Sequence, residues 1–173
     1  MKGFHKDPLA HPEDLIRQVY AYAAYRLGDG HEAEDVTSEV FERAIRYRRS
    51  YDRSKGEPIG WLLGIARRCA DDALARRPRH EPGPEEIATV GSVEDDTVRR
   101  LALDGALAQL SERDQELISL RYGAELTAPQ IAQMMDAQTN AIEVALHRAL
   151  GRLRRILEAE DAETPRLSGS GRV

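Results

Sequence analysis

A short pair of predicted helices near the C-terminus carries the side chains best suited to reading DNA. Residues 127–135 and 139–157 show helical periodicity and are joined by a short turn, which is typical of a helix-turn-helix motif. The second helix of such a motif enters the major groove, where Asn reads adenine and Arg reads guanine or a phosphate. Its polar face carries Asn140, Val144, His147, Arg148 and Arg155. Periodicity alone explains an ordinary helical hairpin with a solvated face equally well.

A second cluster has the composition of a platform for single-stranded nucleic acid. Bases stack on aromatic rings while cations follow the phosphates, so the two residue types must alternate along the chain. The cluster consists of Arg43, Arg46, Tyr47, Arg48, Arg49, Tyr51, Arg53, Lys55, Trp61, Arg67, Arg68, Arg76 and Arg77. The alternative is that Trp61 fills the core and the arginines solvate a surface. Composition alone favours that alternative slightly.

An acidic run precedes this cluster, at the start of a predicted helix. It comprises Glu32, Glu34, Asp35, Glu39 and Glu42. A charge run of this kind is usually a solvated helix face. The functional alternative is a docking surface for a basic or apolar groove on a partner, with Val40 and Phe41 close to the contact.

The residues do not combine into a catalytic or metal site. The five histidines are scattered, and His31 with Asp35 lacks a third ligand. The single cysteine, Cys69, can form neither an internal disulfide nor a structural zinc site. No glycine-rich phosphate loop of the required form is present. We therefore predict a protein that is not an enzyme and that needs no cofactor or metal.

The charge of the chain argues against a protein that binds DNA alone. The net charge is −5, and neither of the two predicted helical segments, 10–77 and 101–157, is positive overall. Stand-alone DNA-binding domains usually have a pI above about 9. Most of the phosphate attraction must then come from a larger basic partner. No apolar run approaches the roughly 18 residues that span a bilayer, and no signal peptide is recognisable, so we predict a cytoplasmic protein without membrane insertion.

Apolar spacing predicts three helices in the first half of the chain. The first covers 13–27, and Gly28 and Gly30 end it through their backbone freedom. The others cover 32–48 and 58–77, where Pro58 suits a first turn. Their core-facing stripes include Ile16, Tyr20, Ala23, Leu27, Val36, Val40, Ala44, Leu62, Leu63, Ala66 and Ala70.

The second half is predicted to be a separate helical domain. Ser111 can cap a helix that ends at Gly123, and Thr127 with Gln130 has the form of a capping box. We predict an all-α fold of two small helical domains, 10–77 and 97–158, of which the second is a helix-turn-helix domain. The proline- and acid-rich residues 78–96 are predicted to be a flexible linker, and residues 159–173 a disordered tail.

Taken together, these segments resemble the extracytoplasmic-function (ECF) sigma factors of the sigma-70 family. AEDVTSEVFERAI (Ala33–Ile45) is similar to the core-polymerase-binding helix of that family, usually close to AEDLVQEVFLRAW. YDRSKGEPIGWLLGIARRCADDALARR (Tyr51–Arg77) resembles the segment that melts and reads the −10 promoter element. LSERDQELISLRYGAELTAPQIAQMM and HRALGRLRRIL, within Leu110–Leu157, resemble the −35-reading domain. The resemblance covers most of the chain in the family order.

The resemblance implies roles for residues at matching positions. Binding of the polymerase clamp is implied for Asp35, Glu39, Val40, Phe41 and Glu42. Contacts to the −10 element are implied for Tyr51, Arg53, Lys55, Trp61, Arg67, Arg68, Asp71 and Asp72. Contacts to the −35 element are implied for Thr139, Asn140, Glu143, Val144, His147, Arg148 and Arg152. The implied partners are core RNA polymerase (clamp and flap), promoter DNA and an anti-sigma factor.

Several positions depart from the family pattern. Ser38 stands where Gln is common, and Arg68 replaces a frequent Asn. The recognition segment reads NAIEVA (140–145) where the family is nearer GTVKSR, so Glu143 and Ala145 replace cations. Loss of those cations removes phosphate attraction, and Glu143 could accept a hydrogen bond from a cytosine amino group.

The sequence leaves competing hypotheses. The first is a sigma factor that binds core polymerase, directs it to specific promoters and is controlled by an anti-sigma factor. The second is a sigma-like adaptor or decoy that occupies polymerase or an anti-sigma protein without reading promoters, a reading that Glu143 motivates. A stand-alone helix-turn-helix repressor fits poorly with the near-neutral second domain.

Overall fold

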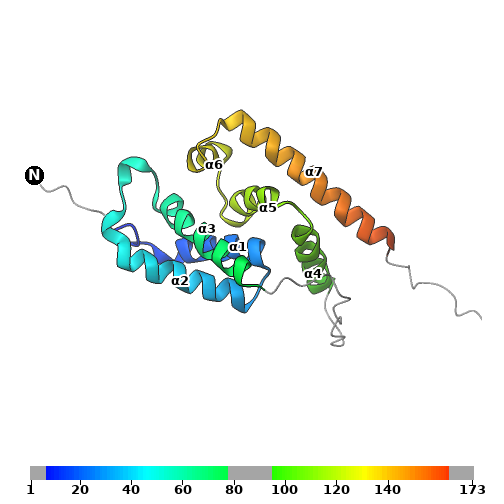
Figure 1. Ribbon diagram of the computed structural model, residues 1–173, viewed down its shortest axis with the longest axis horizontal. Helices are drawn as coiled ribbons and strands as arrows, with labels where there is room; N and C mark the ends of the chain where they lie inside the picture. The colour runs from blue at the N-terminus through cyan, green and yellow to red at the C-terminus, as the bar shows by residue number, and fades with distance from the viewer. Residues whose placement is uncertain (1–6, 78–94, 164–173) are drawn as a thin grey trace, which may run out of the picture.

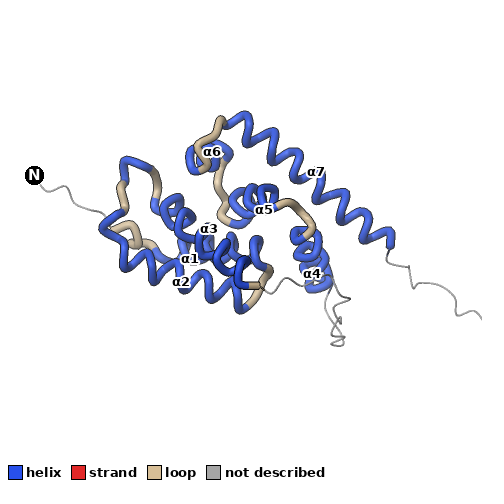
Figure 2. Tube along the Cα trace, in the orientation of Figure 1, coloured by secondary structure: helices blue, strands red, loops and turns tan. Residues whose placement is uncertain are grey.

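The computed structural model describes residues 7–77 and 95–163, and every regular element within these ranges is helical (Figures 1 and 2). The all-α prediction is confirmed. Most of the predicted linker and the end of the predicted tail, residues 78–94 and 164–173, lie outside the described residues.

The first helical group consists of three α-helices and two short 3₁₀ turns. They are α1 (Pro12–Leu27), α2 (His31–Tyr47), η1 (Arg48–Ser50), η2 (Arg53–Lys55) and α3 (Pro58–Arg76). Pro12 and Pro58 lie at the first positions of α1 and α3, where the missing N–H has no helical partner to lose. Gly28, with φ 89°, and Gly30, with φ 141°, form the turn between α1 and α2. Such backbone angles strongly favour glycine.

The second helical group contains four α-helices and one π-helical turn. They are α4 (Asp95–Ala108), α5 (Glu112–Ile118), η3 (Ser119–Gly123), α6 (Ala128–Met134) and α7 (Thr139–Glu163). Ser111 accepts a hydrogen bond from the Asp114 N–H at 3.3 Å, which confirms the predicted cap. The Thr127 N–H donates to Gln130 Oε1 at 2.8 Å, as a capping box requires. α7 runs along the outer edge of the molecule in Figure 1.

Two elements differ from the prediction. The helix expected to reach Gly123 changes to π-helical bonding after Ile118, with the Ala124 N–H bonded to the Ser119 carbonyl at 2.9 Å. Periodicity cannot distinguish this wider turn from a regular one. The last helix continues past Leu157 to Glu163, because no glycine or proline interrupts it there. Its extension is tied back to the turn that follows α4, where Gln109 Nε2 donates to Glu160 Oε1 at 2.7 Å.

The two helical groups are packed together around one hydrophobic core, which we call the shared core. Its buried side chains come from α1, α2 and α3 and also from α5, η3, α6 and α7. They include Val19, Tyr22, Val36, Val40, Leu62, Leu63, Leu117, Leu120, Ile131, Ile142 and Leu146. A smaller cluster closes α4 against α5 and α7 through Leu107, Leu110, Ile118 and Leu153. In Figure 1, α5 lies between the first helical group and α7.

Leu120 tests the contribution of the shared core to stability. Its side chain is fully buried, so we expect Leu120→Ala to lower the free energy of unfolding by about 2–5 kcal/mol through lost burial and a residual cavity. Urea denaturation followed by circular dichroism measures this change. Leu101→Ala, at a side chain that is 64% exposed, is the control and should unfold at the wild-type urea concentration. Equal midpoints for the two variants would contradict the packing.

Candidate promoter and polymerase interfaces

The polar face of α7 lies open to solvent. Asn140, Glu143, Val144, His147 and Arg148 are exposed, and Thr139 is half-buried. The opposite face holds α7 in place, because Ile142, Leu146, Ala149 and Leu153 are buried in the two clusters. The turn from α6 is tight: Asp136 takes a φ of 51°, a conformation that Asp tolerates better than most residues. The helix-turn-helix geometry therefore presents the predicted −35-reading side chains on one accessible surface.

Arg152 differs from its neighbours on α7 because its guanidinium is bound within the protein. Arg152 Nε and Nη2 donate to the two carboxylate oxygens of Asp114 at 2.6 and 2.7 Å. These hydrogen bonds, with one from Ser111, hold the pKa of the Asp114 carboxyl below its ordinary value despite burial. The pair braces α7 against the start of α5. A DNA contact by Arg152 stays a prediction, and it would have to share the side chain with Asp114.

The loop after α2 is shaped by its own aromatic and polar contacts. The ring centroids of Tyr51 and Trp61 lie 5.6 Å apart, and the two ring planes are inclined at 56°. The Tyr51 hydroxyl donates to the Gly56 carbonyl at 3.0 Å, and burial raises the pKa of this phenol. Arg53 and Lys55 are exposed at the loop tip. The two aromatic residues predicted for the −10 region therefore shape the loop, and neither is fully exposed: Tyr51 is buried and Trp61 is half-buried.

The four predicted charges of α3 fall into two pairs. Arg68 and Asp72 are exposed, and Asp72 lies 3.7 Å from the Arg43 guanidinium. Arg67 and Asp71 are engaged in contacts between elements, Arg67 with Glu116 of α5 and Asp71 with Arg26 of α1. The structure thus brings only part of the predicted −10 set to a free surface.

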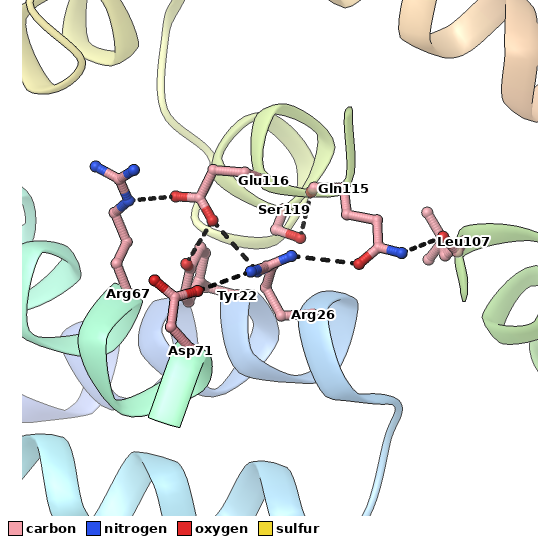
Figure 3. A network of polar contacts seen from close by, with 8 residues as sticks. All are labelled: Tyr22, Arg26, Arg67, Asp71, Leu107, Gln115, Glu116 and Ser119. Carbon is pink, nitrogen blue, oxygen red and sulfur yellow. Dashed lines mark hydrogen bonds and ion pairs between the residues drawn. The ribbon is translucent and has the colours of Figure 1, made fainter. Parts of the chain in front are cut away.

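Sequence reasoning missed the polar network in which Arg67 and Asp71 take part (Figure 3). At its centre, the Glu116 carboxylate accepts a hydrogen bond from the Tyr22 hydroxyl at 2.8 Å. Arg67 Nε lies 2.8 Å from Glu116 Oε1, and Arg26 Nε lies 3.3 Å from Oε2. Only the position of Glu116 beside the apolar Leu117 and Ile118 hinted that this charge would be buried.

Arg26 links this centre to both sides of the network. Its Nη2 donates to Asp71 Oδ1 at 3.0 Å and its Nη1 to Gln115 Oε1 at 3.2 Å. The Gln115 amide in turn donates to the Leu107 carbonyl at 2.9 Å. The Arg26 and Glu116 side chains are only 4% and 8% exposed. Burial raises the pKa of Glu116, against the opposing effects of Tyr22, Arg67 and Arg26.

The polymerase-binding residues predicted on α2 are divided between surface and core. Asp35 and Glu42 are exposed, while Glu39 and Phe41 are half-buried. Val40 is fully buried in the shared core, so any part that it has in binding would come from positioning α2. Ile45, 58% exposed, is a large apolar side chain near the end of α2 that the prediction did not include.

No group of three or more His, Cys, Asp or Glu side chains that could hold a metal ion is found within residues 7–77 and 95–163. The same ranges contain no helix with the length and hydropathy needed to cross a membrane. Cys69 is buried in α3, and burial raises the pKa of its thiol.

The Asp114–Arg152 pair gives a prediction with a defined pH dependence. Because the folded protein lowers the Asp114 pKa, the pair stabilises the fold above the ordinary Asp value and loses this effect as pH falls through the folded value. Arg152→Ala should therefore lower the urea midpoint at pH 7, and its difference from wild type should shrink below about pH 4. Arg154→Ala, an exposed arginine on the same helix, is the control. A pH-independent difference would contradict this account.

Comparison with protein families identifies both helical groups. Residues 13–80 match the model of Sigma-70 region 2, and residues 106–155 match that of Sigma-70, region 4. The chain is 39% identical over 172 residues to the ECF RNA polymerase sigma factor ShbA of Streptomyces griseus, a match that covers 88% of this chain and 86% of ShbA. It is 33% identical to the ECF sigma factor BldN of Streptomyces coelicolor, with 80% of this chain and 56% of BldN covered.

A solved structure confirms the fold. The sigma factor RpoE, in its complex with the anti-sigma factor NepR from Bartonella quintana, superimposes with a TM-score of 0.63 at 19% identity, over 84% of this chain and 93% of RpoE. The order of the two matched regions and the identity to ShbA indicate the same family, and the exposed helix-turn-helix is consistent with it. The chain belongs to the ECF RNA polymerase sigma factors of the sigma-70 family, which bind core RNA polymerase and direct it to promoters.

Proposed function

We propose that α7 reads the −35 element of the promoter through its exposed face, and this exposure is the observation that carries the proposal. Asn140 and Arg148 supply the donors suited to base edges, and Glu143 supplies an acceptor suited to a cytosine amino group. The buried face of the same helix fixes the orientation of these side chains. The first and second helical groups then act as sigma domains 2 and 4.

The −10 element is assigned to the loop that follows α2 and to the adjoining face of α3. Arg53, Lys55 and Arg68 are exposed cations, and Tyr51 with Trp61 forms an aromatic pair beside them. This combination suits a separated strand, whose bases stack while its phosphates pair with cations. Arg67 belongs to the same surface, but in this arrangement it faces Glu116.

The acidic face of α2 is assigned to binding the clamp of core polymerase, and the second helical group to binding the flap. On α2, Asp35 and Glu42 are exposed, and Glu39 is half-buried beside them. Neither helical group has a net positive charge, so DNA affinity depends on assembly. Two weak readers held on one polymerase gain effective concentration for each other, and neither must bind alone.

Control by an anti-sigma factor is proposed from the structural comparisons. RpoE of Bartonella quintana was solved with the anti-sigma factor NepR, and CnrH, with a TM-score of 0.61 at 17% identity, with the cytosolic domain of CnrY. A protein partner that covers the α2 or α7 surface would keep this chain from polymerase or promoter. The site of action is then the cytoplasm, where the polymerase is, and no catalytic activity is involved.

The adaptor or decoy alternative is favoured by one observation, the carboxylate of Glu143 in the middle of the α7 face. Reconstitution with bacterial core polymerase on fragmented genomic DNA separates the two functions. Discrete transcript starts that share two upstream elements support promoter reading. Stable polymerase binding without initiation supports the adaptor. The absence of polymerase binding at micromolar concentration contradicts promoter reading and leaves only a decoy for an anti-sigma protein.

His147 and Arg148 provide the residue-level test. In the double variant His147→Ala and Arg148→Ala, we expect transcript yield at target promoters to fall about tenfold or more, because each lost base contact costs about 1–3 kcal/mol. Polymerase binding should be unchanged. Arg113→Ala, an exposed arginine on α5, is the matched control and should keep its transcripts. Unchanged transcription by the double variant would contradict promoter reading through α7.

A further inference from the structure

The Arg152 guanidinium is held by only one of its edges. Its Nε and Nη2 donate to the two Asp114 oxygens at 2.6 and 2.7 Å, so this contact uses two of the five N–H donors of the planar group. The other edge, formed by Nη1 and the second N–H of Nη2, keeps its donors. The Arg152 side chain is 43% exposed and that of Asp114 only 9%, so the free edge is the part that reaches solvent.

Asp114 is a rigid acceptor. Its N–H is bonded to the Ser111 hydroxyl at 3.3 Å in the first turn of α5, and Leu117 and Ile118 anchor that helix in the interior. Because the pKa of the Asp114 carboxyl lies below its ordinary value, both oxygens are acceptors at neutral pH. The carboxylate therefore fixes the plane of the Arg152 guanidinium and the direction of its free edge.

The position of Arg152 on α7 suits a phosphate better than a base. At about 100° per residue, Arg152 lies about 40° around the helix from Arg148 and about 80° from Val144, at the side of the exposed face. A recognition helix in the major groove has base edges below its centre and a phosphate backbone along each side. The free edge of a guanidinium matches two phosphate oxygens with two parallel N–H donors.

Arg152 differs from the neighbouring arginines in its order. Arg148 and Arg155 are exposed on the same side of α7, and within the described residues neither is paired with a carboxylate. Such long side chains lose rotamer freedom when they bind a phosphate. Arg152 has lost this freedom already. The Asp114 carboxylate also repels a phosphate, but the cation lies between the two anions, so orientation is the larger effect.

We propose that Asp114 is a positioning residue for promoter binding, which holds Arg152 with its free edge toward a backbone phosphate beside the −35 element. The inference rests on the proposed reading of that element by α7. The ion pair is kept in the complex, and Arg152 serves the carboxylate and the phosphate at once. A phosphate contact carries no sequence information, so the pair sets the affinity and register of α7 and leaves base selection to the residues nearer its start.

The experiment uses the full chain assembled with core polymerase and two duplex fragments. One fragment is a promoter recovered by the transcription experiment, and the other is the same fragment with its −35 element scrambled. Affinity for both is measured over a range of salt concentrations. Asp114→Asn removes the charge of the acceptor and keeps its shape. Glu112→Gln, at an exposed carboxylate on the same helix, is its control and should match wild type.

Arg152→Ala should weaken binding to both fragments by the same factor, about tenfold, because a charged hydrogen-bonded contact is lost. The slope of log affinity against log salt should fall by about one, as for the loss of one phosphate contact. Asp114→Asn should weaken both equally, by about threefold, because an unpaired arginine must first be ordered. In the Arg152→Ala background, Asp114→Asn should have no further effect.

Three results would overturn the proposal. Tighter binding by Asp114→Asn would make the carboxylate a competitor of DNA. Wild-type affinity and salt slope in Arg152→Ala would leave the pair as a brace of α7 alone. A loss confined to the promoter fragment would mean that Arg152 reads a base or that α7 has shifted.

Circular dichroism at the assay temperature verifies that each variant is folded. Arg152→Lys, which keeps a cation beside Asp114 but lacks the fork, is the second variant if Arg152→Ala is unstable, and it should show the same equal loss on both fragments. The wild-type chain tests the proposed function separately. Equal wild-type affinity for the two fragments would contradict −35 reading, whereas the phosphate contact is measured on either fragment.

Discussion

The burial of one carboxylate between two helical groups is the constraint on which this structure depends. Apolar side chains of the shared core supply the attraction, but apolar contacts are non-directional and would accept several orientations. Glu116 favours a single orientation of the two groups, because only that orientation brings its carboxylate to Tyr22 and Arg26 on α1 and to Arg67 on α3. The location of the other functional surfaces, exposed or covered, follows from this single orientation.

The helices of this chain were predictable because local signals determine them. These signals act over a few residues: proline in a first turn, the Ser111 cap and the Thr127–Gln130 pair. In the structure a helix begins at each of them. The exposed face of α7 was predictable for the same reason, since periodicity separates it from Ile142 and Leu146. The residue roles themselves came from family resemblance and await the experiments above.

The packing of the groups was not predictable, because its determinants are far apart in the chain. Glu116 and Tyr22 are separated by most of the protein, and nothing near Glu116 in sequence shows that its partners come from α1 and α3. The sequence does not indicate the close approach of Gly123 to α1 either, since a glycine at a helix end is usually explained by the turn itself. Tertiary contacts decide both, and they also place Val40 in the core.

The buried position of Cys69 has a consequence for signalling. Thiolates, and not thiols, react with oxidants, and burial that raises the pKa of Cys69 keeps its sulfur protonated and shielded. It is the only cysteine in the chain. Oxidative stress would therefore reach this protein through a thiol only after the first helical group had itself come apart. A redox signal that acts through a thiol must therefore be sensed by another molecule while this chain is folded.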